Sequence, residues 1–371
     1  MGEALAEHAK RYTFIDALRG FAAFGVVLHH AFHGSEFHEP LTRIFPGWFQ
    51  WICSFGARGV QIFFVLSGFV IAYSIRDMRV TPRSMGNFML RRQIRLDPAY
   101  WLCLMLLFAN QTMAAHFHPQ LVSRPTVPHF FLNMVYVQEM LRIPSLLGVA
   151  WTLCLEVQFY ILLIVLVGIA QRVLVKYPHY AAAALVGGLG LASLYVRIGV
   201  HSEADIPWFI GSWYLFASGA LACWTLARRI HPAIFVTFAA MILAAGLYTG
   251  QDSIIAGAVT VSLIFTVGTL GHLGDWLANR VIQYFGRISY SLYLIHLLVL
   301  ERISRVGLHL HGANAPGWAV FWFVVATIAS IAAAQLLYVA VERPTVRLAA
   351  ALKPAKTKAP QAAPEPATAL T

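Results

Sequence analysis

Apolar segments of about 20 residues, separated by short polar connections, follow one another along most of this chain. Because a membrane-spanning helix needs roughly 20 apolar residues, the pattern predicts an all-α fold, a polytopic helical bundle in a bilayer. The segments lack the alternation over about ten residues that is typical of an outer-membrane barrel. We expect about ten spans, at residues 14–33, 56–75, 98–115, 150–170, 181–199, 208–227, 232–249, 253–271, 281–300 and 317–341.

Composition agrees with this class and excludes an ordinary soluble domain. Of the 371 residues, 59% are hydrophobic and 12% are charged, whereas soluble domains average about 45–50% and about 25%. A net charge of +11 raises the question of nucleic acid, but the basic residues flank apolar spans, as expected beside anionic lipid. We therefore expect membrane lipid as a partner and no nucleic acid.

The distribution of basic residues predicts the topology. With ten spans and an inner N-terminus, the inner segments hold nineteen of the 27 lysines and arginines and the outer segments hold seven, with Arg19 inside a span. This asymmetry indicates that both termini are cytoplasmic. We expect a cytoplasmic N-terminus (1–13) leading into an uncleaved first span, a transmembrane domain (14–346) and a disordered cytoplasmic tail (347–371). The four cysteines have no metal-ligand spacing, so no metal is expected.

The first span carries more ionisable groups than membrane anchoring requires, namely Asp16, Arg19, His29, His30 and His33. Arg19 and His30 are eleven residues apart, three helical turns plus ~20°, so they share one face about 16 Å apart. Such groups in a span favour a role in chemistry or transport. The alternative is that the histidines bond carbonyl groups of a neighbouring helix, while Asp16 and Arg19 form an interfacial ion pair. For this helix alone, both interpretations stay open.

The connection between the second and third spans holds six arginines from Arg76 to Arg95. Arg91 and Arg95 are one helical turn apart, and together with Arg92 they could clamp a phosphate-rich ligand from the cytoplasm. The positive-inside rule alone also explains the cluster, and the charges by themselves favour that explanation. Pro98 is expected to start the third span.

Three other spans contain polar candidates. In the second span, Arg58 and Gln61 could line an outer polar cavity, and Gly68 predicts close helix packing. In the fourth span, Glu156 is expected at the depth of His30, where a carboxylate could orient an imidazole and stabilise its charged form. The alternative is a structural pair between Glu156 and Arg58.

The ninth span, GRISYSLYLIH, contains Arg287, Ser289, Tyr290, Tyr293 and His296. Both tyrosines lie near one face and can hydrogen-bond while remaining largely apolar. Interfacial anchoring is the alternative, and it suits Tyr290 better than the deeper Tyr293. The tenth span ends at VERPTVR, which is most simply a helix terminus.

Six fragments in order, DALRG with His30 eleven residues after Arg19, GVQIFFVLSGF, RLDPAYW, WTLCLEVQFY, GRISYSLYLIH and ERP, resemble acyltransferase family 3. The resemblance covers residues 14–344. It implies a ten-span enzyme that moves an acyl group, usually acetyl, from cytoplasmic acyl-CoA to a carbohydrate hydroxyl at the outer side. It also implies that Arg19 and His30 are essential, that Arg95 and Pro98 belong to the site, and that Glu156 lies near it.

These observations combine into one hypothesis for a multi-pass protein of the bacterial inner membrane. Acetyl-CoA is the expected co-substrate, bound by Arg91, Arg92, Arg95, Arg287, Tyr290 and Tyr293. His30, oriented by Glu156, then acts as a base or carries the acyl group. Asp16 is expected to hold Arg19.

The acceptor is expected to be an exported or lipid-linked carbohydrate, bound by Arg58, Gln61 and the outer residues 34–55 and 116–149. A transporter or flippase of a glycan or lipid-linked sugar is the alternative, disfavoured because the two halves show no paired, broken helices. The sequence leaves the oligomeric state, including a homo-oligomer, open.

Overall fold

The structure, a computed structural model, describes residues 12–117, 120, 124–199, 208–312 and 316–352. In these ranges the chain forms helices and connections and no β-strand. The α-helices are α1 (Thr13–His33), α2 (His38–Ile44), α3 (Gly47–Phe55), α4 (Gly59–Ile75), α5 (Pro82–Phe117), α6 (Val127–Met134), α7 (Trp151–Val173), α8 (Pro178–Gly199), α9 (Trp213–Leu226), α10 (Pro232–Thr249), α11 (Asp252–Thr269), α12 (Arg280–His311), α13 (Pro316–Leu337) and α14 (Arg343–Ala351).

The structure confirms a helical membrane protein, although it does not confirm ten spans. Each predicted span coincides with a helix. Six segments of the described residues are long and apolar enough to cross a membrane: Gly47–Ile75, Trp151–Val173, Pro178–Gly199, Pro232–Thr249, Asp252–Thr269 and Pro316–Ala351. Helix α9 is apolar but shorter than a span. Helices α1, α5 and α12 are continuous, but charged and histidine side chains interrupt their apolar sequence.

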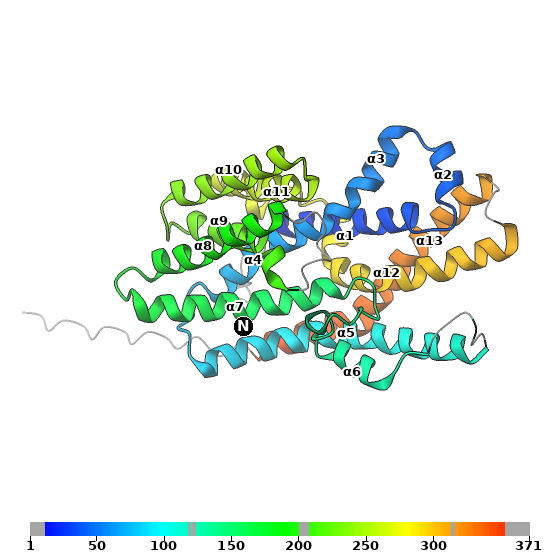
Figure 1. Ribbon diagram of the computed structural model, residues 1–371, viewed down its shortest axis with the longest axis horizontal. Coiled ribbons are helices and arrows are strands. Elements are labelled where there is room, and N and C mark those ends of the chain that lie inside the picture. The colour runs from blue at the N-terminus through cyan, green and yellow to red at the C-terminus, as the bar shows by residue number, and fades with distance from the viewer. Residues whose placement is uncertain (1–11, 118–119, 121–123, 200–207, 313–315, 353–371) are drawn as a thin grey trace, which may run out of the picture.

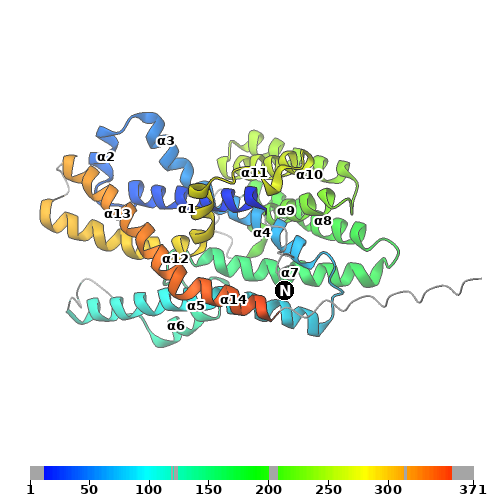
Figure 2. The same cartoon turned by 180° about the vertical axis from the view of Figure 1, so that it is seen from behind.

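Helices α1 and α12 lie side by side and run in the same direction, as both views show (Figures 1 and 2). Their backbones touch near the start of each helix, where a Cβ atom added at Gly20 would lie 2.7 Å from the backbone nitrogen of Gly286. Further along, the rings of Phe24 and Phe285 are 5.1 Å apart. This close approach places the polar groups of both helices next to one another.

A second backbone contact joins α4 to α9. A Cβ atom at Gly68 would lie 2.0 Å from the carbonyl oxygen of Phe216, and one at Gly219 would lie 2.0 Å from that of Val65. This confirms the prediction that Gly68 serves close packing. Helices α7, α8, α10 and α11 gather around this pair on the other half of the molecule (Figure 1). There Phe159, Phe216 and many others form the largest buried cluster.

Helix α5 is a continuous helix of 36 residues that contains Pro98 in its interior. The expectation that Pro98 is a first-turn residue was wrong: the arginine-rich connection is itself helical from Pro82 onward. Helix α14 packs beside α5 (Figure 2), so residues 347–351 of the expected tail are helical. Residues 353–371 of that tail and residues 1–11 of the expected N-terminal segment lie outside the described residues.

The segment before α7 folds back into the bundle. Leu147, Val149 and Ala150 are buried, and the hydroxyl of Tyr136 donates a 2.8 Å hydrogen bond to Asp97 on α5. Helix α7 therefore begins among other helices and not at the molecular surface.

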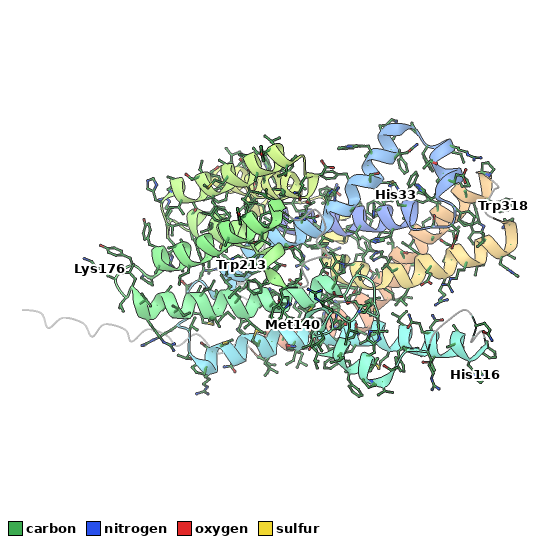
Figure 3. All side chains as sticks on the ribbon, in the orientation of Figure 1. His33, His116, Met140, Lys176, Trp213 and Trp318 are labelled. Atoms are coloured by element: carbon green, nitrogen blue, oxygen red, sulfur yellow. The ribbon has the colours of Figure 1, made fainter. Side chains whose placement is uncertain are left out.

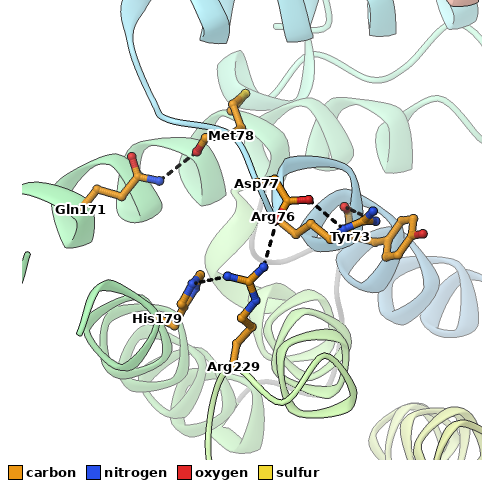
Figure 4. Close-up of polar contacts among 7 residues, drawn as sticks. All are labelled: Tyr73, Arg76, Asp77, Met78, Gln171, His179 and Arg229. Atoms are coloured by element: carbon orange, nitrogen blue, oxygen red, sulfur yellow. Dashed lines mark hydrogen bonds and ion pairs between the residues drawn. The ribbon is translucent and has the colours of Figure 1, made fainter. Parts of the chain in front are cut away.

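Labelled side chains mark the two ends of the long axis of the molecule (Figure 3). His33, His116 and Trp318 lie at one end and Lys176 lies at the other (Figure 3). At the Lys176 end, Asp77 accepts a 3.0 Å bond from Arg229, which also lies 3.0 Å from His179. Nearby, the Gln171 side chain donates to the carbonyl of Met78 (Figure 4). These bonds fasten the α4–α5 connection to α7, α8 and the α9–α10 turn.

Candidate functional site

A cavity that is partly open to its surroundings lies among α1, α4, α5, α7 and α12, and its empty space, the open part included, is about 740 Å³. Its polar lining consists of Arg19, Ser67, Arg92, Arg95, Thr152, Glu156, Tyr160, Tyr290 and Tyr293. Its apolar lining consists of Val60, Phe63, Phe64, Leu66, Val70, Leu96 and Leu153. The cavity thus offers cationic groups and an extensive apolar wall to the same ligand.

Three arginines from two helices give the cavity its charge. Arg19 comes from α1, and Arg92 and Arg95 come from α5, where they lie about one turn apart. The guanidinium of Arg92 stacks over the Tyr160 ring at 4.6 Å. Like-charge repulsion acts on Arg95 from Arg19 and Arg92. A polyanionic ligand would relieve this repulsion, because guanidinium groups bind phosphate through paired donors.

A buried carboxylate outside the lining, Glu342, balances part of this charge. It attracts Arg95 and accepts hydrogen bonds from the hydroxyl (2.6 Å) and the backbone nitrogen (3.2 Å) of Ser291. Glu342 ends a π-helical turn, Tyr338–Glu342, and such turns often occur at functional sites. Sequence reasoning treated this position as a helix terminus; an ionisable residue at the end of an apolar span was the signal to follow.

Glu156 lies in the cavity, with Ser67 as its hydrogen-bond partner. The Ser67 hydroxyl donates a 2.6 Å hydrogen bond to its carboxylate, and Tyr160 lines the same cavity. The expected contact with His30 is absent from the described structure, where His30 bonds to other groups. The reason is the inward fold of residues 135–150, which starts α7 deeper than an outer-surface helix would start. A catalytic role for Glu156 stays a prediction.

His30 lies one layer of rings beyond the cavity wall. Its Nδ1 atom is 2.9 Å from the Val26 carbonyl oxygen and 3.3 Å from Nε2 of His296. The His296 ring lies 5.1 Å from that of His30 and 6.0 Å from that of Tyr293, which lines the cavity. The adjacent His29 instead contacts the Cys53 carbonyl oxygen, so His30 is the imidazole directed towards α12.

The family follows from comparison with known proteins. A family model described as "Acyltransferase domain" (Acyl_transf_3) matches residues 12–339. The chain belongs to acyltransferase family 3. It is an enzyme that transfers acyl groups.

Two of the three relatives described here are named for exopolysaccharide production or peptidoglycan O-acetylation. This acyltransferase is 25% identical to Nodulation protein 10 of Rhizobium leguminosarum bv. viciae, over 95% of this chain and 98% of the relative. It is 29% identical to the exopolysaccharide production protein ExoZ of Rhizobium meliloti, over 79% and 90%. It is 24% identical to the peptidoglycan O-acetyltransferase OatA of Listeria monocytogenes, over 81% of this chain and 51% of that protein. No solved structure matches significantly.

Of the residues expected to hold the acyl donor, Arg91 and Arg287 lie outside the cavity lining of this acyltransferase. Arg91 donates to the Asn87 carbonyl, and Arg287 is exposed. Arg76, in the same basic connection, pairs with Asp77 at 3.1 Å. Arg92 and Arg95 remain, and Arg19 joins them, because α1 and α5 border the same space.

The other predicted site residues of the acyltransferase are more scattered. Arg58 pairs with the exposed Asp252 at 3.6 Å, and not with Glu156. Gln61 is buried but does not line the cavity, and Asp16 occupies the first turn of α1. Among the described residues, no group of three or more His, Cys, Asp or Glu is arranged to hold a metal ion. Roles for Arg58, Gln61 and Asp16 stay predictions.

Proposed function

We propose that this protein is an O-acetyltransferase of the bacterial inner membrane. It takes an acetyl group from cytoplasmic acetyl-CoA and places it on a hydroxyl of an exported or lipid-linked carbohydrate. Both termini lie on the cytoplasmic side, so the end that carries His33, His116 and Trp318 faces outward. The observation that carries the proposal is one cavity holding three arginines, with an imidazole directly beyond its wall.

The cavity suits an acyl-CoA in two respects. Arg19, Arg92 and Arg95 provide planar donors for phosphate oxygens. The apolar wall, with Phe63 and Val60 among its residues, accommodates the pantetheine arm. The thioester then reaches the end of the cavity near Tyr293, and His30 lies two ring contacts further on.

His30 can perform the transfer in either of two ways. As a base, its Nε2 atom takes the proton of the acceptor hydroxyl, and the oxygen attacks the thioester carbonyl carbon. The carbon–sulfur bond breaks, and the CoA thiolate receives the proton from His30. As a nucleophile, Nε2 first takes the acyl group and releases CoA, and the hydroxyl then attacks the acyl-imidazole. Both routes require an unprotonated Nε2 atom.

A carbohydrate acceptor is supported by the names of the relatives, which include exopolysaccharide production and peptidoglycan O-acetylation. The end of the molecule where α1 terminates also suits it. There α2 and α3 form an arch at the end of α1 (Figure 1), and Trp48 and Trp51 on α3 are exposed. Exposed aromatic rings provide stacking surfaces for sugars, and this arch lies within residues 34–55.

The test uses purified full-length protein in detergent with acetyl-CoA labelled in the acetyl group. The wild type should release labelled acetate or transfer label to an added membrane glycan fraction, whereas His30→Gln should do neither while still binding CoA. A wild type that binds CoA but never cleaves the thioester would overturn the proposal and favour a carrier. Mass spectrometry of surface glycans from a deletion strain, searched for the loss of one acetyl increment, then identifies the acceptor.

A further inference from the structure

His296 on α12 is assigned a role neither by the sequence motifs nor by the comparisons. Its side chain is completely buried, and histidine is a polar residue whose buried nitrogen atoms need partners. Those partners are two backbone carbonyl groups of α12 and the ring of His30. His296 is thus the one side chain, among the described residues, that hydrogen-bonds to the imidazole of His30.

The backbone of α12 determines which nitrogen of His296 carries the proton. Nδ1 lies 2.9 Å from the Tyr293 carbonyl oxygen and 3.1 Å from that of Leu292. Carbonyl oxygens only accept hydrogen bonds, so Nδ1 must be the donor. A neutral imidazole has one N–H group, and Nε2 of His296 is therefore an acceptor.

The protonation of His296 determines that of His30, because Nε2 of His296 lies 3.3 Å from Nδ1 of His30. An acceptor at Nε2 of His296 requires a proton on Nδ1 of His30, and the Val26 carbonyl, 2.9 Å from the same atom, requires it too. The Nε2 atom of His30 then keeps its lone pair. That is the atom which both routes of acyl transfer use.

We propose that His296 is a positioning residue that holds the catalytic His30 in the tautomer and orientation needed for acyl transfer. The inference rests on the proposed function. When Nε2 of His30 takes up a proton or an acyl group, the ring becomes cationic and Nδ1–H donates more strongly. His296 and the Val26 carbonyl then accept from it. A second imidazole thus occupies the place that sequence reasoning gave to the carboxylate of Glu156.

The kinetic test compares two amides of different length. In His296→Gln, the side-chain oxygen can reach the place of Nε2 and accept from His30. In His296→Asn, the amide replaces only the Nδ1 side of the ring. We expect His296→Asn and His296→Leu to lower kcat for acetyl-CoA cleavage roughly 10- to 100-fold, the effect of one hydrogen bond to a charged group, with KM little changed. His296→Gln should recover most of that loss.

His309→Leu, which removes an exposed histidine from the same helix, is the matched control and should keep wild-type kinetics. If His296→Asn and His296→Leu cleave acetyl-CoA as fast as the wild type, the inference is overturned and the proposed function stands. A parallel fall in kcat for Asn, Leu and Gln, accompanied by loss of thermal stability, would also overturn it, because a packing role predicts that pattern. An inactive wild type overturns the proposed function and this inference together.

A spectroscopic measurement on the wild type decides the case if His296→Asn and His296→Leu do not fold. In protein labelled with ¹⁵N-histidine, the wild type should show a coupling between His30 Nδ1 and His296 Nε2 across the hydrogen bond. The signals are assigned by their loss in His30→Gln and in His296→Gln. An N–H signal at Nε2 of His30 would contradict the proposal, whatever the activity.

Discussion

Replacing Arg92 with Gln tests the assignment of the cavity to the acyl donor. Arg92 lines the cavity and stacks on Tyr160, while its neighbour Arg91 points to its own helix backbone. A hydrogen bond to a charged group contributes about 1.5–3 kcal/mol, and about 1.4 kcal/mol corresponds to a tenfold change in affinity. Because Arg19 and Arg95 remain, Arg92→Gln should weaken CoA binding by roughly tenfold, near the lower limit.

The measurement is equilibrium binding of labelled CoA to protein in detergent, at two ionic strengths. Arg91→Gln is the control and should change the dissociation constant less than about threefold, since Arg91 lies outside the cavity lining and partly exposed charges act weakly. Salt should weaken binding to the wild type more than binding to Arg92→Gln, because one of the interacting charges is gone. Equal losses of CoA affinity in the two variants, or no loss in Arg92→Gln, would refute the assignment of the cavity to the acyl donor. The basic segment would then be explained by membrane topology alone.

Three further predictions concern other positions. His30→Gln should lower acyl transfer by roughly 10²–10⁴-fold without weakening CoA binding, and retained transfer in stably folded protein would remove His30 from the mechanism. Glu156→Gln should lower KM for acetyl-CoA, because it removes the only carboxylate among the described lining residues; a higher KM would contradict this. Gly68→Ala should reduce stability by about 1–3 kcal/mol, because its Cβ would meet the Phe216 carbonyl oxygen at 2.0 Å. Gly188→Ala, where nothing lies within 4 Å, should leave the melting temperature in detergent unchanged.

Hydropathy was sufficient to locate a helix for each expected span, because the requirement for apolar length acts on each segment separately. It did not predict the short helices α2, α3, α6 and α14. Every expected span coincides with a helix, and Gly68 packs as its small size predicted. Pro98 shows the limit of local rules. Its place inside α5 depends on how neighbouring helices support the backbone around it, which the residues flanking Pro98 do not reveal.

The candidate site was predictable where two residues share one helix, and less so where they come from different helices. Arg19 and His30 could be related by counting turns along α1. The partner of His30 could not, because the depth of Glu156 depends on the buried path of residues 135–150, which hydropathy treats as an ordinary connection. His296 was visible as a histidine in an apolar span, but only the pairing of α1 with α12 shows which ring it meets.

The glycine contact between α1 and α12 has a consequence for natural variation. Ten residues separate Gly20 from His30, and ten separate Gly286 from His296, a rise of about 15 Å along each parallel helix. The depth at which the two backbones meet therefore sets the level at which the two imidazoles face each other. A natural Gly20→Ala substitution is expected to inactivate the enzyme although every ionisable residue remains in place. A mutational screen restricted to polar positions would overlook it.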